Sequence, residues 1–174
     1  MAKRQGKDSE LIKLYRGAWD VLDAYDKETL ATEGDTKKPV KLTVRELAAA
    51  LEAFKAFWIK EKNEDAEFAV ERNKDGVEAI IGNVMQSFGK KEVYPTVEEK
   101  AANLFYFIVK NHPFIDGNKR SGAYVFVWLL HQAGILDINR IPPSTLTALT
   151  LLIAGSGSKE KEKIIKLILT LLKK

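Results

Sequence analysis

Two apolar stretches, AANLFYFIV at residues 101–109 and AYVFVWLL at residues 123–130, constrain what this chain can fold into more than any other feature. Helices this apolar have little polar surface, so both stretches are expected to form central, buried helices. Between them lies the polar decapeptide NHPFIDGNKR, residues 111–120. Polar groups are costly to hold between two buried helices unless they are paired or used, so this loop is the candidate functional site.

The residues of the loop set the ends of the two helices. Pro113 disfavours the helical conformation at His112, so the first helix is expected to end near Asn111 or His112. Gly117 permits a tight turn with positive φ, and Asn118 can act as the N-cap of the second helix. The end of the loop is therefore expected to coincide with a helix N-terminus.

A helix N-terminus with basic side chains favours binding of an anion. The free N–H groups and the helix dipole attract negative charge, and Lys119 and Arg120 add two formal positive charges. Asp116 would repel a phosphate unless Mg²⁺ lay between them, since Mg²⁺ is commonly held by one or two carboxylates plus substrate phosphates. His112 can accept a proton near neutral pH. The alternative is a capped helix–helix turn in which His112 and Asp116 are merely solvated.

The same loop resembles the signature of the Fic/Doc (Fido) proteins, which is His-x-Phe-x-Asp/Glu-Gly-Asn followed by Gly or Lys and then Arg. The broader stretch at residues 75–134 is also similar to the C-terminal Fic-like domain of RhuM-type virulence proteins. The residues that match the signature are, in order, His112, Phe114, Asp116, Gly117, Asn118, Lys119 and Arg120.

The resemblance implies a role for each of these positions. His112 would be the general base that deprotonates a target hydroxyl, and Asp116 would bind Mg²⁺. Residues 117–119 would form a phosphate-binding nest, and Arg120 would hold a phosphate. The implied reaction is transfer of AMP from ATP to a hydroxyl side chain of another protein (AMPylation), in a toxin–antitoxin or virulence setting in bacteria.

Two positions depart from the AMP-transferring pattern and keep other functions open. Lys119 stands where those members usually carry Gly, and Ala123 stands where they carry a second Arg. Both features resemble the Doc branch, whose members phosphorylate their targets, although Doc has Ala at the position of Gly117. Loss of a guanidinium removes a bidentate phosphate clamp. A Doc-like kinase and a catalytically silent nucleotide-binding module are therefore the alternatives.

Length and composition limit the class of protein. The chain has 174 residues, of which 45% are hydrophobic and 30% charged, which favours a single globular domain over residues 1–174. It contains no cysteine, no apolar run of the roughly 20 residues that a membrane helix needs, and no secretory signal, so a cytoplasmic protein is expected. The net charge of +4 is spread along the chain, so no nucleic-acid partner is expected.

The remaining patterns predict a mainly α fold: a Fic-like bundle of about seven or eight helices with one short β-hairpin flap. Capping boxes beginning at Thr43 and Thr96 mark two helix starts. Phe114 is expected to turn into the core. Residues 68–77 end in an Asp-Gly turn signal and fit either a hairpin or a plain loop. The resemblance favours the hairpin as the flap, which would hold a target backbone as an added strand. The spacing of residues 11–25 predicts a first helix with a core-facing apolar stripe made of Leu11, Leu14, Tyr15, Trp19, Leu22 and Tyr25.

A short stretch before the second helix suggests regulation. Residues 29–34, TLATEG, are similar to the inhibitory motif of some Fic proteins, in which a Glu blocks the nucleotide site. Here that residue would be Glu33, although its usual partner, the second Arg, is Ala123. The alternatives are self-inhibition by Glu33, inhibition by an antitoxin partner, or an ordinary loop.

Overall fold

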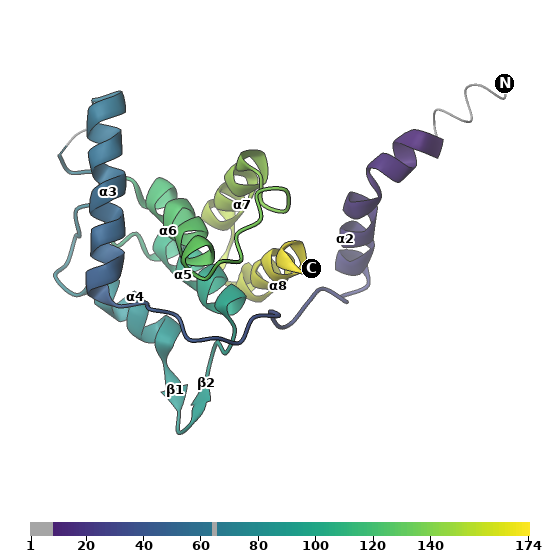
Figure 1. Ribbon diagram of the computed structural model, residues 1–174, viewed down its shortest axis with the longest axis horizontal. Coiled ribbons are helices and arrows are strands. Elements are labelled where there is room, and N and C mark those ends of the chain that lie inside the picture. Colours follow the sequence, from purple (N-terminus) through teal and green to yellow (C-terminus); the bar gives the residue numbers. More distant parts are fainter. Residues whose placement is uncertain (1–8, 64–65) are drawn as a thin grey trace.

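A computed structural model describes residues 9–63 and 66–174 of the chain (Figure 1). It is mainly helical and carries a two-stranded antiparallel hairpin, which confirms the predicted fold class. No helix in this described part is long and apolar enough to cross a bilayer. Residues 9–14 are helical and precede the elements α2 (Arg16–Asp26), α3 (Val44–Lys62), α4 (Gly76–Met85), β1 (Ser87–Phe88), β2 (Lys91–Glu92), α5 (Val97–Asn111), α6 (Asn118–Gln132), α7 (Pro143–Gly155), η1 (Ser158–Glu160) and α8 (Lys161–Leu172).

Helices α5 and α6 form the centre of the molecule, as the two apolar stretches predict. The rings of Phe105 and Phe126 stack between them with centroids 4.9 Å apart. Gly122 allows the close approach, because a Cβ there would lie 2.7 Å from a methyl group of Val109. The predicted capping box fixes the start of α5: the Thr96 hydroxyl accepts from the Glu99 N–H at 3.2 Å, and the Glu99 carboxylate accepts from the Thr96 N–H at 3.1 Å.

The other helices cover this central pair. Helix α3 begins after Thr43, whose side chain accepts a hydrogen bond from the Glu46 N–H, as its capping box predicts. Phe54 on α3 stacks on Tyr124 of α6, with ring centroids 4.3 Å apart. Helices α7 and α8 lie against the α5–α6 pair from another side (Figure 1). Helix α8 docks on the core through Ile164, Ile165, Ile168 and Leu169, which are buried.

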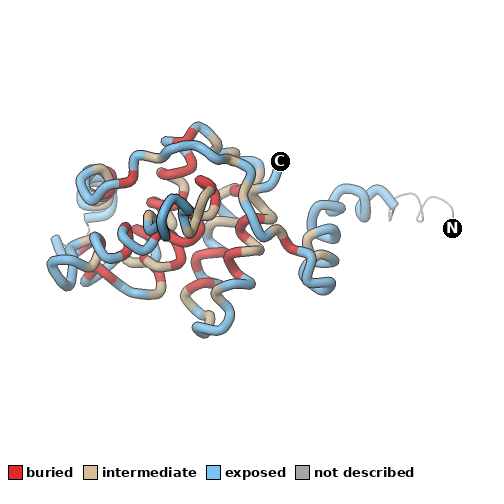
Figure 2. The backbone as a smooth tube through the Cα atoms, turned by 90° about the horizontal axis from the view of Figure 1, so that it is seen from below, coloured by how far each residue is buried: buried red, intermediate tan, exposed pale blue. Residues whose placement is uncertain are grey.

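The apolar stripe near the N-terminus does not face the core, and this expectation is wrong. Helix α2 and residues 9–14 project from the body of the molecule (Figure 1), and all the predicted stripe residues are exposed. Helices α7 and α8 pack on the central pair instead. Figure 2 shows the contrast between this exposed arm and the buried centre.

The hairpin also lies elsewhere than predicted. Gly76 is the first residue of α4, with Asp75 as its N-cap, so the Asp-Gly pair starts a helix instead of turning a hairpin. The Glu71 carboxylate accepts a hydrogen bond from the Val77 N–H at 2.8 Å and thus satisfies one free donor of that helix. The observed hairpin pairs β1 with β2 around Gly89, whose φ of +63° suits a tight turn.

Candidate active site at the signature loop

The signature loop connects the end of α5 to the start of α6, as predicted. Helix α5 ends at Asn111, and His112 is its C-cap in the left-handed conformation (φ 49°, ψ 58°). Helix α6 begins at Asn118, but the N-cap is Gly117 (φ 79°), which corrects the expected capping role of the Asn118 side chain. Phe114 is 1% exposed and anchors the loop in the core, as expected.

The Asn118 side chain is used inside the loop. Its Oδ1 accepts from the Phe114 N–H at 2.9 Å, and its Nδ2 donates to the Phe114 carbonyl, also at 2.9 Å. These two bonds close the loop over four residues and hold both backbone groups of Phe114. Asn118 can therefore contribute its backbone N–H to an anion while its side chain fixes the shape of the loop.

Gly117 is required by both conformation and space. Its φ of +79° is one that L side chains rarely adopt, and a Cβ there would lie 2.5 Å from Cδ2 of Phe68. Phe68 is fully buried and its ring packs against Phe54 and Trp58 of α3. The backbone at Gly117 therefore lies so close to the Phe68 ring that no side chain fits between them.

Residues 69–72 pair with the loop as a short irregular strand. The Ala69 N–H donates to the Asp116 carbonyl at 3.1 Å, and the Ile115 N–H donates to the Val70 carbonyl at 2.8 Å. The Arg72 N–H donates to the Pro113 carbonyl, also at 2.8 Å. The segment predicted as a flap is therefore a backbone support of the signature loop.

Arg72 is a site residue that the sequence did not reveal. Its Nε donates to the Phe114 carbonyl at 2.8 Å, and its Nη2 lies 3.4 Å from the Ile115 carbonyl. The guanidinium therefore holds the loop through these hydrogen bonds and adds a positive charge beside it. No local pattern marks this arginine, because its partners lie about forty residues further along the chain.

Two charged side chains of the loop, Asp116 and Arg120, lie close to each other. Arg120 Nη2 is 3.7 Å from Asp116 Oδ2, and their side chains are 35% and 55% exposed. The Arg120 guanidinium also lies over the rings of Trp58 and Phe68, 4.8 and 4.6 Å from their centroids. These aromatic contacts orient the guanidinium. An ion pair this exposed stabilises the fold little, so both groups remain available to a ligand.

All the predicted site residues border one open cavity of about 410 Å³. The first N–H groups of α6 have no intrahelical partner, so this rim combines backbone donors with side-chain cations. That combination suits an oxyanion with several oxygens, such as a phosphate. The cavity is lined by Arg72, His112, Ile115, Asp116, Gly117, Asn118, Lys119 and Arg120.

The site fits a shared magnesium ion better than a dedicated metal centre. Among the described residues no group of three or more His, Cys, Asp or Glu side chains could hold a metal. Asp116 offers a single exposed carboxylate at the edge of the anion site. One carboxylate plus substrate phosphates is an ordinary coordination set for Mg²⁺.

Ala123 leaves space where the second arginine of AMP-transferring members would lie. One turn along α6 from the loop, it borders an apolar hollow of about 250 Å³ that also touches Lys119 and Arg120. The far wall of the hollow comes from α7. That wall consists of Leu146, Thr147, Thr150 and Leu151.

Glu33 lies far from the signature loop. Its neighbour Gly34 contacts the start of α5, where a Cβ would lie 2.6 Å from a carboxylate oxygen of Glu98. Thr36 holds this segment in place, since its N–H donates to Glu98 at 3.1 Å and its carbonyl accepts from the Val97 N–H at 2.9 Å. His112 follows the opposite end of this 15-residue helix, about 22 Å away along the axis. In this arrangement Glu33 does not reach the site of its own chain.

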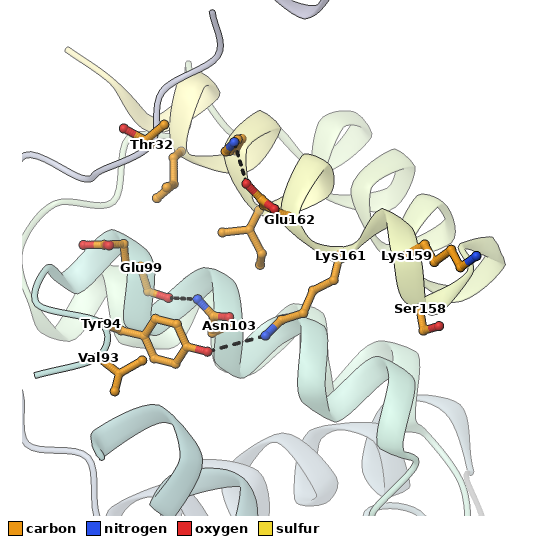
Figure 3. Close-up of a pocket in the computed structure, with 12 residues that line it drawn as sticks. Thr32, Val93, Tyr94, Glu99, Asn103, Ser158, Lys159, Lys161 and Glu162 are labelled. Carbon is orange, nitrogen blue, oxygen red and sulfur yellow. Dashed lines mark hydrogen bonds and ion pairs between the residues drawn. The ribbon is translucent and has the colours of Figure 1, made fainter. Parts of the chain in front are cut away.

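A larger hollow of about 600 Å³ lies elsewhere, between α5 and α8 (Figure 3). None of the signature residues lines it. Its polar groups interact with one another: Lys161 Nζ lies 3.4 Å from the Tyr94 hydroxyl and over the ring of Phe107, and the Asn103 amide donates to the Glu99 carbonyl.

Comparison with known proteins identifies the family of this chain. Residues 41–130, just over half of the chain, match the family model of the Fic/DOC family. No significant match was found among curated proteins or solved structures. The chain therefore belongs to the Fic/DOC family, whose members generally transfer AMP or a related group to target proteins and generally bind ATP with Mg²⁺.

Proposed function

We propose that this protein transfers AMP from ATP to a hydroxyl side chain of a target protein, in a reaction that depends on Mg²⁺. The observation that carries the proposal is that His112 and the anion-binding start of α6 border the same cavity. A base and a phosphate site on one rim are what transfer of a phosphorus group to a hydroxyl requires.

Each residue has a defined part in this reaction. His112 accepts the proton of the target hydroxyl while the hydroxyl oxygen attacks the α-phosphorus of ATP. The new oxygen–phosphorus bond forms as the bond to pyrophosphate breaks, and pyrophosphate leaves with the electron pair. The N–H groups of residues 117–119, with the side chains of Lys119 and Arg120, bind the phosphate oxygens. Asp116 would hold the Mg²⁺, which neutralises phosphate charge when bound.

Transfer of the γ-phosphoryl group is the second candidate function. The observation in its favour is the pair Lys119 and Ala123, because without a second arginine the triphosphate can lie in another direction along the rim. The residue roles stay the same, but the target oxygen then attacks the γ-phosphorus and ADP leaves. A third candidate is nucleotide binding without turnover, in which the domain serves as an interaction module.

One experiment separates these candidates. The protein is incubated with bacterial lysate and ATP labelled at either the α- or the γ-phosphate, beside a His112→Ala variant. His131, the other histidine of the chain, is exposed in the last turn of α6, so His131→Ala is a matched control.

AMP transfer predicts a protein band from the α-label alone, present with His131→Ala and absent with His112→Ala. A band from the γ-label alone identifies phosphoryl transfer. Tight ATP binding by calorimetry with no labelled product supports the binding module. A His112→Ala protein that labels targets at the normal rate would show that the proposed base is wrong.

A further inference from the structure

Arg72 carries a positive charge that no acid in the described part of the chain pairs with. Its side chain donates to the carbonyl of Phe114 at 2.8 Å and lies 3.4 Å from that of Ile115, and it has no described carboxylate partner. A carbonyl is a dipole without net charge, so these bonds fix the guanidinium but do not neutralise it. Because Arg72 is exposed, the charge is accessible to a ligand.

The contacts with the loop use one edge of the guanidinium. The group has five N–H donors, one on Nε and two on each Nη. The loop takes Nε and Nη2, which share the side edge of the planar group. Both donors of Nη1 and one donor of Nη2 are left, and the end edge between these two nitrogens has the fork geometry that suits an oxyanion such as a carboxylate. Arg72 is therefore held at one edge and open at the other.

Arg72 lies beside the proposed base. Its backbone N–H donates at 2.8 Å to the carbonyl of Pro113, the residue that follows His112. Lys119 and Arg120 instead follow the start of α6, where the phosphate donors are. All three cations border the same cavity. Under the proposed function the target hydroxyl must come within hydrogen-bond reach of His112, so the target chain would pass at the Arg72 end of the cavity.

We propose that Arg72 selects target hydroxyls that have an aspartate or glutamate within two residues in the target chain. This role rests on the proposed function, because it requires the target hydroxyl to lie at His112. The open edge of Arg72 binds the target carboxylate while the hydroxyl faces the base. Asp116 borders the same cavity, but its carboxylate lies 3.7 Å from Arg120, which offsets its repulsion of a second acid. A charged group at such a rim contributes mainly to the choice of partner.

The test uses fluorescent nonapeptides with a central Tyr, Thr or Ser among alanines and glycines. One set carries an Asp within two residues of the hydroxyl, and a second set of equal net charge carries it four residues away, about 14 Å along an extended chain. Binding to the His112→Ala protein with ATP is measured by fluorescence anisotropy, so that no transfer occurs during the titration. The near-Asp peptides should bind roughly fivefold more tightly than the far-Asp peptides.

Variants in the same background assign this preference to one side chain. Arg72→Gln should abolish it, and Arg72→Glu should replace it with a preference for a nearby Lys. Arg45→Gln is the matched control, because it removes the same charge at the start of α3, about 20 Å along the axis from Trp58, whose ring contacts Arg120. The control should keep the fivefold preference. Equal binding of near-Asp and far-Asp peptides, no binding of either, or a preference that survives Arg72→Gln overturns the inference.

Two further readouts separate this role from the alternatives. Affinity for ATP, measured by calorimetry, should be unchanged by Arg72→Gln. A loss of ATP affinity with an unaltered peptide preference would place Arg72 on a nucleotide phosphate and overturn the inference. Transfer of label from ATP to the near-Asp peptides by the protein with intact His112 tests the proposed function separately. Selective binding that depends on Arg72, without any transfer, would support recognition of acidic targets and overturn the proposed reaction.

Discussion

Replacement of Gly117 by alanine tests the contact between the signature loop and Phe68. The new methyl group would first have to adopt a φ of +79°, which costs an L residue roughly 1–2 kcal/mol. It would also lie 2.5 Å from Cδ2 of Phe68, whereas non-bonded carbon atoms normally stay about 3.5–4.0 Å apart. The ring is fully buried against Phe54 and Trp58, so it cannot move freely, and overpacking of this kind costs about 1–3 kcal/mol.

The total expected loss of unfolding free energy is therefore about 2–5 kcal/mol, measurable by urea denaturation. Gly134→Ala is the matched control: its φ of +71° imposes the same strain, but nothing lies within 4 Å of the added Cβ. That variant should lose only about 1–2 kcal/mol. If the two variants were destabilised equally, within about 0.5 kcal/mol, the close approach of Phe68 to the loop would be refuted.

Two further predictions concern Arg72, beside the site, and Glu33, far from it. Arg72→Lys keeps the charge but loses the paired hydrogen bonds to the Phe114 and Ile115 carbonyls. Loss of these partly exposed bonds should cost about 1–2 kcal/mol, so target labelling should fall about five- to thirtyfold. Full activity of the lysine variant would mean that only charge matters at this position. Glu33→Gly should leave the labelling rate unchanged, because its segment is held at the far end of α5. A several-fold rise in rate would instead indicate that Glu33 inhibits the site, from its own chain or from another copy.

Several features of this protein follow from local sequence. Thr43 and Thr96 start helices because each side chain satisfies a backbone donor three residues away. Pro113 restricts the residue before it, and α5 accordingly ends at Asn111. The predicted site residues, His112 and residues 116–120, share one cavity because they lie close together in the chain. In each case the interacting groups lie within a few residues, so a short pattern contains the necessary information.

The tertiary structure decided the features that depend on distant residues. Asp75 and Gly76 are as suitable for a hairpin turn as for a helix start, and packing of α4 against α5 selected the helix. Arg72 became a site residue through contact with a loop about forty residues later. An apolar stripe in the sequence indicates that a helix has an apolar face, but it does not indicate which other element packs against that face. The sequence by itself thus determined the helices and the chemistry of the loop, while the arrangement in space determined what supports that loop and left the N-terminal stripe exposed.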